Sequence, residues 1–325
     1  MHLKLILPIG DFSMNKTVVI TGASSGIGRS CVKRMQSAGW RVFATVRKAT
    51  DRDKVQITNL AGVVPVLMDV SDQASIASAA AEIETHLNGQ ALDGVVNVAG
   101  IGMVRPLEYA MMKDVREIFE INFFGQLAVT QALLRVLRQN RGRIVNITTV
   151  GVNLAIPFGG LLNASKSAFA MISDTLRLEM HPFGVRVCAV EPGAISTPAV
   201  DKTLGDLEQV IASLPSEAQE QYGTIIRKMG KRAYAMEKNG SSPEVVADAV
   251  HHALTSERPR IRYRVGKHAR LLATLPKVLP ESVMDAIRIR MFGLTAPRES
   301  ASARPGTCAK RGAIGSPRPA IVNPK

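Results

Sequence analysis

The chain has 325 residues and an ordinary globular composition, with 46% hydrophobic, 21% charged and 4% aromatic residues. This composition excludes an intrinsically disordered protein, and no apolar run reaches the roughly 18 to 20 residues that a membrane-spanning helix requires. The three cysteines, Cys31, Cys188 and Cys308, lack the spacing of a zinc site or a disulfide framework. We therefore expect no metal and a reducing, cytoplasmic location.

The net charge of +14 is concentrated at the C-terminal end of the chain. Residues 256–295 hold nine basic against three acidic residues, and residues 296–325 hold six against one, which leaves +3 for the first 255 residues. The basicity therefore does not belong to the main fold. We interpret residues 258–295 as a basic amphipathic extension and residues 296–325 as a disordered tail.

The first residues are predicted to be a leader. Residues 1–13 contain a short apolar patch at 5–9 but no small-residue cleavage site, so a secretory signal is not favoured. Met14 stands just before the first strand-like run, and a true start at this methionine stays open.

From Lys16 onward, short β-branched runs alternate with longer segments of helical periodicity. Parallel strands need helical crossovers, so this alternation predicts one α/β domain over residues 14–257, a doubly wound parallel sheet of Rossmann type. Residues 198–240 show no strand pattern and are predicted to form a mobile helical lid over a site. The predicted strands are 17–21, 41–46, 63–68, 94–98, 143–148 and 185–190, with 260–265 a weaker seventh. The predicted helices are 27–38, 71–87, 113–138 and 164–181.

The first predicted strand runs into Gly-Ala-Ser-Ser-Gly-Ile-Gly at residues 22–28, which a helix follows. Glycines allow a tight turn here, and the amides of the turn and of the helix N-terminus suit a pyrophosphate. A glycine turn after a strand is also compatible with simple chain reversal. The motif alone leaves both interpretations open.

Residues 21–28 resemble the cofactor turn of the short-chain dehydrogenase/reductase family. Further motifs follow at family-like spacings: Asp69-Val70, Asn97-Val98-Ala99-Gly100, Asn122, Ala164-Ser165-Lys166 and Pro192-Gly193. The turn at residues 191–193 resembles the branch of the family that acts on steroids, retinoids and other lipophilic alcohols or ketones. The resemblance extends over residues 16–257, and it implies a Rossmann-type fold and an NAD(P)(H)-dependent oxidoreductase.

The resemblance also implies which residues contact the cofactor. They lie in the glycine turn, after the third and fourth strands, on a later helix, and after the sixth strand, where the segment touches the nicotinamide amide. These residues are Gly22, Ser24, Gly26, Ile27, Gly28, Asp69, Val70, Asn97, Ala99, Gly100, Lys166, Pro192, Gly193, Ile195 and Thr197. Taken singly, Asp69 and Asn97 are also compatible with strand-end capping and turn formation.

The residues after the second strand bear on the choice of cofactor. An acid there would accept hydrogen bonds from a ribose 2′-hydroxyl and repel a 2′-phosphate, but the chain has Val46 followed by Arg47 and Lys48. A cation beside the ribose favours the phosphate, so Arg47 is a candidate cofactor contact and NADP(H) is expected over NAD(H). Ser25, where many NADP-preferring relatives carry a base, argues against this, and a solvated strand end is the alternative.

The resemblance implies an active tetrad of Asn, Ser, Tyr and Lys, with Tyr four residues before Lys and Ser thirteen before Tyr. Asn122 and Lys166 are present, but Leu162 stands at the tyrosine position and Thr149 at the serine position. The phenol donates the proton as hydride arrives, and leucine cannot do this. A positioned acid–base group contributes about 10²–10⁴ in rate, so we expect weak or altered activity.

Two functions therefore remain open. One is an NADP(H)-dependent oxidoreductase of a small lipophilic hydroxyl or carbonyl substrate, and the other is a catalytically inactive protein that binds dinucleotide or a lipophilic ligand on the same scaffold. Relatives commonly pair through the helices predicted at 113–138 and 164–181, so a homodimer or homotetramer is expected. The stretch 258–295 is expected to contact anionic membranes peripherally or to be a solvated extension. It has too few aromatic residues for nucleic acid, which is not expected as a partner.

Overall fold

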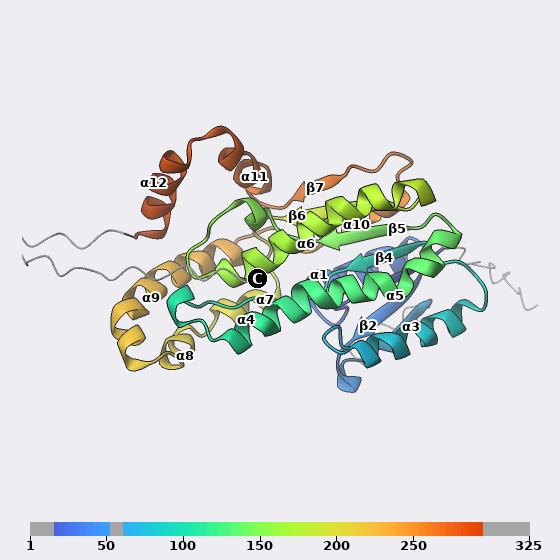
Figure 1. The fold of residues 1–325 in the computed structure, drawn as a ribbon, viewed down its shortest axis with the longest axis horizontal. Helices are drawn as coiled ribbons and strands as arrows, with labels where there is room; N and C mark the ends of the chain where they lie inside the picture. Colours follow the sequence, from blue (N-terminus) through green and yellow to red (C-terminus); the bar gives the residue numbers. More distant parts are fainter. Residues whose placement is uncertain (1–15, 53–60, 295–325) are drawn as a thin grey trace, which may run out of the picture. The chain divides into compact units, whose positions relative to one another are not determined.

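The computed structural model describes residues 16–52 and 61–294. Within them, seven parallel strands form one sheet in the order β3-β2-β1-β4-β5-β6-β7. Figure 1 labels β2, β4, β5, β6 and β7 among the helices. The chain leaves β1 toward one edge and resumes at β4 on the other side of β1, which is the doubly wound arrangement that the sequence predicts. The strands are β1 (Thr17–Ile20), β2 (Arg41–Val46), β3 (Val63–Leu67), β4 (Gly94–Asn97), β5 (Arg143–Ile147), β6 (Arg186–Pro192) and β7 (Arg262–Val265).

Helices cover both faces of the sheet. Side chains of α1 and α10 pack on one face in a core that includes Met35 and Val250, while α3, α5 and the end of α6 cover the other face around Ile83 and Leu133. All four of these side chains are fully buried. The helices are α1 (Gly26–Ser37), α3 (Gln73–Leu87), α4 (Met112–Phe119), α5 (Gly125–Gln139), α6 (Gly160–Glu179), α7 (Pro198–Leu204), α8 (Leu207–Ala212), α9 (Ser216–Lys238), α10 (Glu244–Thr255), α11 (Ala269–Val278) and α12 (Glu281–Phe292).

The helix predicted over 113–138 is wrong in one respect, because it is two helices. A π-helical turn, Glu120–Phe124, separates α4 from α5. Gly125 begins α5 against the carbonyl oxygen of Val70, where any Cβ would collide with that oxygen. The turn therefore inserts a residue where the helix backbone comes closest to the end of β3, and it carries Asn122 inward.

Two helix boundaries also differ from prediction for local reasons. The helix predicted from residue 71 begins at Gln73, because the Asp72 side chain accepts a hydrogen bond from the amide of Ala74 and caps it. The helix predicted over 164–181 begins earlier, at Gly160, and ends at Glu179. The chain then turns at Gly184, whose φ is +72°.

The boundary predicted at residue 257 falls before the end of the sheet. The weak seventh strand does form: β7 pairs with β6 in parallel, with Tyr263 beside Val190. The stretch interpreted as a basic extension therefore contributes one strand to the fold and then forms α11 and α12. The leader expected at 1–13 and the tail expected at 296–325 lie outside the described residues.

Residues 198–240 form α7, α8 and α9 and no strand, as their sequence predicts. These helices have a small apolar core of their own, in which Ile211, Leu214 and Ile226 pack with Val104. The insertion is thus built as a separate layer beside the sheet. None of the helices in the described part of the chain is both long and apolar enough to cross a membrane.

Candidate functional site

A cavity of about 530 Å³ opens at the carboxyl ends of the strands. Ligands bind at this edge in doubly wound sheets, beside the point where the strand order reverses. Every predicted site residue except Asn97 and Asn122 lines the cavity. The residues that do so are Gly22, Ser24, Gly26, Ile27, Gly28, Arg47, Asp69, Val70, Ala99, Gly100, Thr149, Leu162, Lys166, Pro192, Gly193, Ile195 and Thr197.

The turn after β1 has the geometry of an anion cradle. Gly22 and Gly26 adopt φ values of +64° and +53°, which side chains rarely tolerate. A Cβ on Gly28 would collide with the carbonyl oxygen of Gly22, so the turn closes only with glycine at this point. The N-cap residue Ser25 makes no side-chain cap, and the first turn of α1 contains no acid. The amides at this helix end therefore remain available to a pyrophosphate, and the residues present fit a dinucleotide.

The far end of the cavity combines one cation with two acids. Arg47 follows β2, and Asp51 and Asp69 line the same wall. Partial burial would raise the pKa of Asp69, but hydrogen bonds from the amide and hydroxyl of Ser71 and the nearby charge of Arg47 hold it below its usual value. The Asp69 carboxylate is thus committed to its own turn, and Arg47 is exposed to whatever occupies this end.

Asn97 lies behind the cavity wall, fully buried. Its Nδ2 donates to the hydroxyl of Thr130 at 2.9 Å and to Oδ1 of Asn146 at 2.8 Å. The second bond joins β4 to β5. The side chain therefore holds together the strand ends from which Ala99 and Gly100 enter the cavity, and does not itself line it.

Asn122 also lies behind the wall and is fully buried. Its Oδ1 accepts the amide of Ile101 at 2.8 Å, and its Nδ2 donates to the carbonyl oxygen of Ile101 at 2.9 Å and to the hydroxyl of Ser165 at 3.0 Å. The π-helical turn thus locks the chain after β4 to α6. Asn122 positions the residues that line the cavity.

Lys166 is a buried cation in the cavity wall. Its Nζ donates to the carbonyl oxygen of Ile147 at 2.8 Å and lies 3.4 Å from where a Cβ on Gly100 would stand. The structure places no anion beside it among the described residues. Burial lowers the pKa of Lys166 to about 8, because the charged form loses hydration without gaining a counter-ion.

At the positions of the family's tyrosine and serine, this chain has Leu162 and Thr149, and both residues line the cavity. Thr149 Oγ1 accepts the amide of Gly151 at 3.1 Å. The Leu162 side chain faces Gly102, with Cδ2 3.6 Å from where a Cβ there would stand. The chain has four tyrosines, all within the described residues, and none of them lines the cavity. No phenol therefore reaches this site.

The segment after β6 meets a residue that the sequence did not indicate. Gly193 packs so closely on the carbonyl oxygen of Lys267 that a Cβ would collide with it. Two residues further on, the amide of Ile195 donates to Oε2 of Glu237 at 3.1 Å. Burial raises the pKa of Glu237, and this hydrogen bond only partly opposes the effect. Glu237 lines the cavity from the end of α9.

Other lining residues were also missed by sequence reasoning. Most come from the ends of strands, from the segments that follow them and from α7, while Ile121 comes from the π-helical turn and Glu237 from α9. They are Thr45, Asp51, Met68, Ile101, Gly102, Ile121, Ile147, Thr148, Ala199, Val200, Lys202, Thr203, Leu204 and Glu237. The α7 residues had a usable signal, since they directly follow Thr197 in the predicted lid. Glu237 had none, because it lies at the end of a long amphipathic helix with no motif around it.

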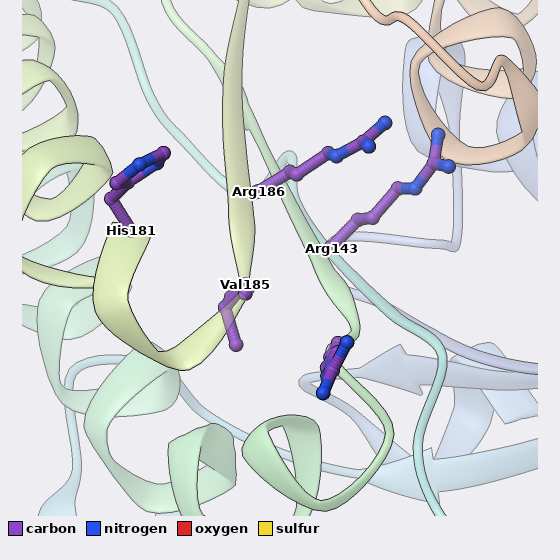
Figure 2. A pocket seen from close by; sticks show the side chains of 6 residues that line it. Arg143, His181, Val185 and Arg186 are labelled. Atoms are coloured by element: carbon purple, nitrogen blue, oxygen red, sulfur yellow. The ribbon is translucent and has the colours of Figure 1, made fainter.

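A second cavity, of about 380 Å³, lies at the amino ends of β5 and β6 and is strongly basic. Arg141, Arg143, His181 and Arg186 line it without any acid. Figure 2 shows the side chains of Arg143 and Arg186 pointing the same way, away from His181. Arg143 Nη1 donates to the carbonyl oxygen of Ala253 at 2.8 Å, and Arg186 donates to that of Glu257. These arginines therefore bind backbone carbonyl groups at and just beyond the end of α10 rather than converging on the hollow.

Comparisons with known proteins agree with this geometry. A family model described as short chain dehydrogenase matches residues 16–208. Among curated proteins, retinol dehydrogenase 5 of Homo sapiens is 34% identical over 281 residues, covering 84% of this chain and 87% of that protein. The 17-beta-hydroxysteroid dehydrogenase type 6 of Rattus norvegicus is 31% identical over 278 residues, covering 84% and 87%. A crystal structure of a short-chain dehydrogenase from Streptomyces avermitilis superposes with a TM-score of 0.64 at 26% identity, covering 86% of this chain and 95% of that one.

Proposed function

The chain belongs to the short-chain dehydrogenase/reductase family, and from this premise we propose that it is an NADP(H)-dependent oxidoreductase of a lipophilic alcohol or ketone, slowed by Leu162. One observation carries the proposal: a single cavity joins the glycine turn at Gly28 to Lys166, Thr149 and Leu162. The relatives named for retinol and for a hydroxysteroid support the lipophilic substrate class.

Each residue contributes a specific element of that chemistry. The nicotinamide dinucleotide, when bound, supplies or accepts the hydride. The amides at Gly26 and Gly28 receive the pyrophosphate, and Lys166 fixes the nearby ribose through its ammonium group. The Thr149 hydroxyl is available to polarise a substrate oxygen. Leu162 excludes water from this wall but offers no proton, so the proton transfer is the step that suffers.

The preference for NADP(H) rests on the wall near Arg47. Arg47 is exposed, lines the cavity, and is followed by Lys48, which adds a second positive charge to this strand end. Val46 stands where an acid would repel a 2′-phosphate. The local charge therefore favours the phosphorylated ribose over the free hydroxyl.

The test begins with cofactor binding. NADPH and NADH are titrated into the protein and followed by nicotinamide fluorescence, and a panel of retinoid and steroid ketones is then offered with NADPH. The double variant Leu162→Tyr, Thr149→Ser is expected to raise turnover by at least about tenfold, the low end of what a positioned acid–base group contributes. Absence of NADPH binding, or fast turnover by the unaltered protein that the double variant does not improve, would contradict the proposal.

The alternative function is an inactive protein that binds dinucleotide or a lipophilic ligand. Leu162 favours it, because no phenol reaches the cavity. The two functions separate in the same experiment. An inactive binding protein binds NADPH but oxidises it with none of the ketones, whereas the proposed enzyme shows slow turnover above the rate in buffer.

We also propose that α11 and α12 contact anionic membranes. Leu271 and Val278 on α11 are 55% and 67% exposed, and Met291 on α12 is 45% exposed. Arg270 and Arg290 are exposed beside them. An amphipathic surface of this kind buries its apolar side in a bilayer, and each cation near an anionic surface adds about 1 kcal/mol.

Sedimentation with vesicles tests this surface. We expect binding to vesicles that contain phosphatidylserine, little binding to phosphatidylcholine alone, and a loss of binding in Leu271→Gln with Val278→Gln. Both substitutions are at exposed positions, so the fold should persist. Equal and negligible sedimentation with both vesicle types would remove the membrane proposal.

A homodimer or homotetramer is proposed from a second exposed apolar surface. Phe124, Met171 and Leu178 are 51%, 67% and 64% exposed on the segment that starts α5 and on α6. Large apolar side chains that are exposed on neighbouring elements are typical of a subunit interface. We expect Met171→Glu to lower the mass measured by light scattering on a size-exclusion column, while Met236→Glu at an exposed position on α9, outside both predicted pairing helices, leaves it unchanged.

A further inference from the structure

The cavity contains few groups that can exchange a proton near Leu162. Among the described lining residues, Arg47, Asp51 and Asp69 belong to the far end, beside the residues that follow β2 and β3. The ionisable residues that remain are Lys166 on α6, Lys202 on α7 and Glu237 on α9. An ionisable side chain of the cavity that replaces the missing phenol would be one of these three.

Two of the three are poorly placed to donate. Lys166 directs its Nζ at the carbonyl oxygen of Ile147, 2.8 Å away, and so supports the strand end. Lys202 is exposed on α7. Glu237 is the only carboxyl group among these three residues.

Glu237 lies at the same end of the sheet as Leu162 and Thr149. Its Oε2 is fixed by the amide of Ile195, which follows β6, whereas Thr149 follows β5. The two strands are paired, with Ile147 beside Val190, and paired strands lie about 4.8 Å apart. The carboxyl group of Glu237 therefore lines the same cavity as Thr149 and Leu162.

The other carboxyl oxygen of Glu237 is not committed. Oε1 has no hydrogen-bond partner in the part of the chain that the structure describes, while Oε2 is held. A carboxyl group that lines a cavity with one oxygen anchored and the other without a hydrogen-bond partner can contact a bound molecule. This is the arrangement that a positioned acid requires.

No counter-ion stabilises the ionised form of Glu237. On the elements packed around it, Lys238 pairs with Asp201 at 2.9 Å, and Lys267 donates to the carbonyl oxygen of Asn239 at 3.3 Å. Lys166 and Lys202 line the cavity but form no ion pair with Glu237 among the described residues. Burial consequently raises the pKa of Glu237 above its usual value.

We propose that Glu237 is the acid–base residue that replaces the family tyrosine, donating its proton to the carbonyl oxygen of the substrate in the reductive direction. The inference rests on the proposed function. In the balanced step, hydride from the reduced nicotinamide forms the new C–H bond, and the carbonyl π electrons move to oxygen. That oxygen takes the Glu237 proton, leaving an alcohol, the oxidised cofactor and a Glu237 carboxylate. Oxidation of the alcohol reverses every transfer.

The test compares Glu237→Gln with the unaltered protein. Glutamine keeps an oxygen that accepts the Ile195 amide, so the local fold should persist while the acidic proton is lost. Glu220→Gln serves as the matched control, because Glu220 is an exposed acid on the same helix. Both variants are measured for NADPH affinity, for kcat with a reducible ketone from pH 5 to 9, and again in a Leu162→Tyr background.

If Glu237 is the donor, Glu237→Gln lowers kcat by about 10²-fold or more with NADPH affinity unchanged, and Glu220→Gln does neither. The unaltered protein loses activity as the pH rises through the Glu237 pKa, and the Gln variant loses this dependence. With tyrosine installed at position 162, the effect of Glu237→Gln should shrink to within about threefold, since a phenol then supplies the proton.

A second readout does not depend on activity. Infrared spectra taken across a pH titration should show a protonated carboxyl band with a midpoint above that of ordinary glutamates, and the band should disappear in Glu237→Gln. An ordinary midpoint, an unchanged kcat in the Gln variant, or an equal loss with tyrosine at 162 overturns the inference. If the unaltered protein turns over slowly and Glu237→Gln leaves kcat unchanged, Glu237 is not a donor although the proposed function stands. If only the Leu162→Tyr protein turns over, the unaltered chain is the inactive binding protein, and the inference fails with the proposed enzyme. If NADPH does not bind at all, the proposed function and the inference fail together.

Discussion

The two ends of the parallel sheet carry opposite kinds of polar surface. At the carboxyl ends, the cavity is walled largely by glycines and aliphatic side chains, and Lys166 and Glu237 each lack a counter-ion among the described residues. At the amino ends, Arg143 and Arg186 are both cations, yet Arg143 donates to a backbone carbonyl oxygen in the last turn of α10 and Arg186 to one just beyond that helix. The candidate site is therefore distinguished by polar side chains that line a cavity without a counter-ion, and not by the number of charged residues.

The register of the strands explains the basic end. Arg143 and Arg186 stand directly beside each other on β5 and β6. Like charges in such positions repel, and burial together with the charge of Arg186 lowers the pKa of Arg143. The carbonyl groups at the end of α10 offset this repulsion, because the C-terminus of a helix is its negative end. At the amino ends of the strands, the arginines are thus already bound to backbone carbonyl groups. At the carboxyl ends, the cavity can admit a ligand.

The largest expected effect concerns Lys166, the buried lysine at the carboxyl ends of the strands. The pKa of Lys166 is lowered from 10.5 to about 8 on folding. A lowered folded-state pKa contributes stability that is fully present above about pH 10.5 and is lost as the pH falls through about 8. We compare the free energy of unfolding of the unaltered protein with that of Lys166→Met. The difference, unaltered minus variant, should rise by about 3 kcal/mol between about pH 7 and pH 10.5. Urea unfolding at each pH measures it, with the exposed Lys33→Met as a control for lost charge. A difference that stays flat across this range would show that Lys166 is hydrated.

The second prediction concerns the glycine turn of the same end. Gly28→Ala places a Cβ against the carbonyl oxygen of Gly22 and must deform the turn. Overpacking of this kind costs about 1–3 kcal/mol, so NADPH affinity should fall about tenfold to a hundredfold. Gly223→Ala on α9 is the matched control, because a Cβ there meets only ordinary contacts, 3.5 Å from a side-chain carbon of Ile211. Equal affinities for the two variants would mean that the turn does not hold the cofactor.

The third prediction concerns Arg143, at the amino ends of the strands. Arg143→Met removes the hydrogen bond to the carbonyl oxygen of Ala253 but also removes a repelled charge. The net loss in unfolding free energy should be about 0.5–1.5 kcal/mol, the range for a single hydrogen bond. NADPH affinity should not change, since the two ends are separated by the length of the sheet. A variant of normal stability that binds NADPH more weakly would contradict the conclusion that the amino ends of the strands take no part in cofactor binding.

The smallest effect is expected at Arg47. Exposed charge pairs contribute about 0.2–1 kcal/mol, so Arg47→Asp should lower the ratio of NADPH to NADH affinity by up to about fivefold. Fluorescence titration of both cofactors gives the ratio. Arg52→Asp, further along the same loop, is the control for a general change in charge. An unchanged ratio would leave Arg47 as a solvated strand end.

Much of the fold follows from local pattern. The alternation of β-branched runs and helical segments predicted the doubly wound sheet and even the weak strand at residues 260–265. Local pattern missed the π-helical turn that carries Asn122, because the break arises where Gly125 meets the carbonyl oxygen of Val70, a contact between residues that are distant in the chain. It also placed the end of the domain before β7, since a short strand with alternating arginines has little hydrophobic signal of its own.

The sequence by itself determined the glycine turn, the places of the strands along the chain and the absence of tyrosine at position 162, because each depends on residue types within one short segment. Only the tertiary structure decided the rest. It places Asn97 and Asn122 behind the cavity wall, where their side-chain amides donate hydrogen bonds to buried partners. It also brought Glu237 from the end of α9 onto the amide of Ile195. These outcomes depend on how α9 and the π-helical turn pack against the strand ends, and packing between distant segments leaves no spacing for a sequence to show.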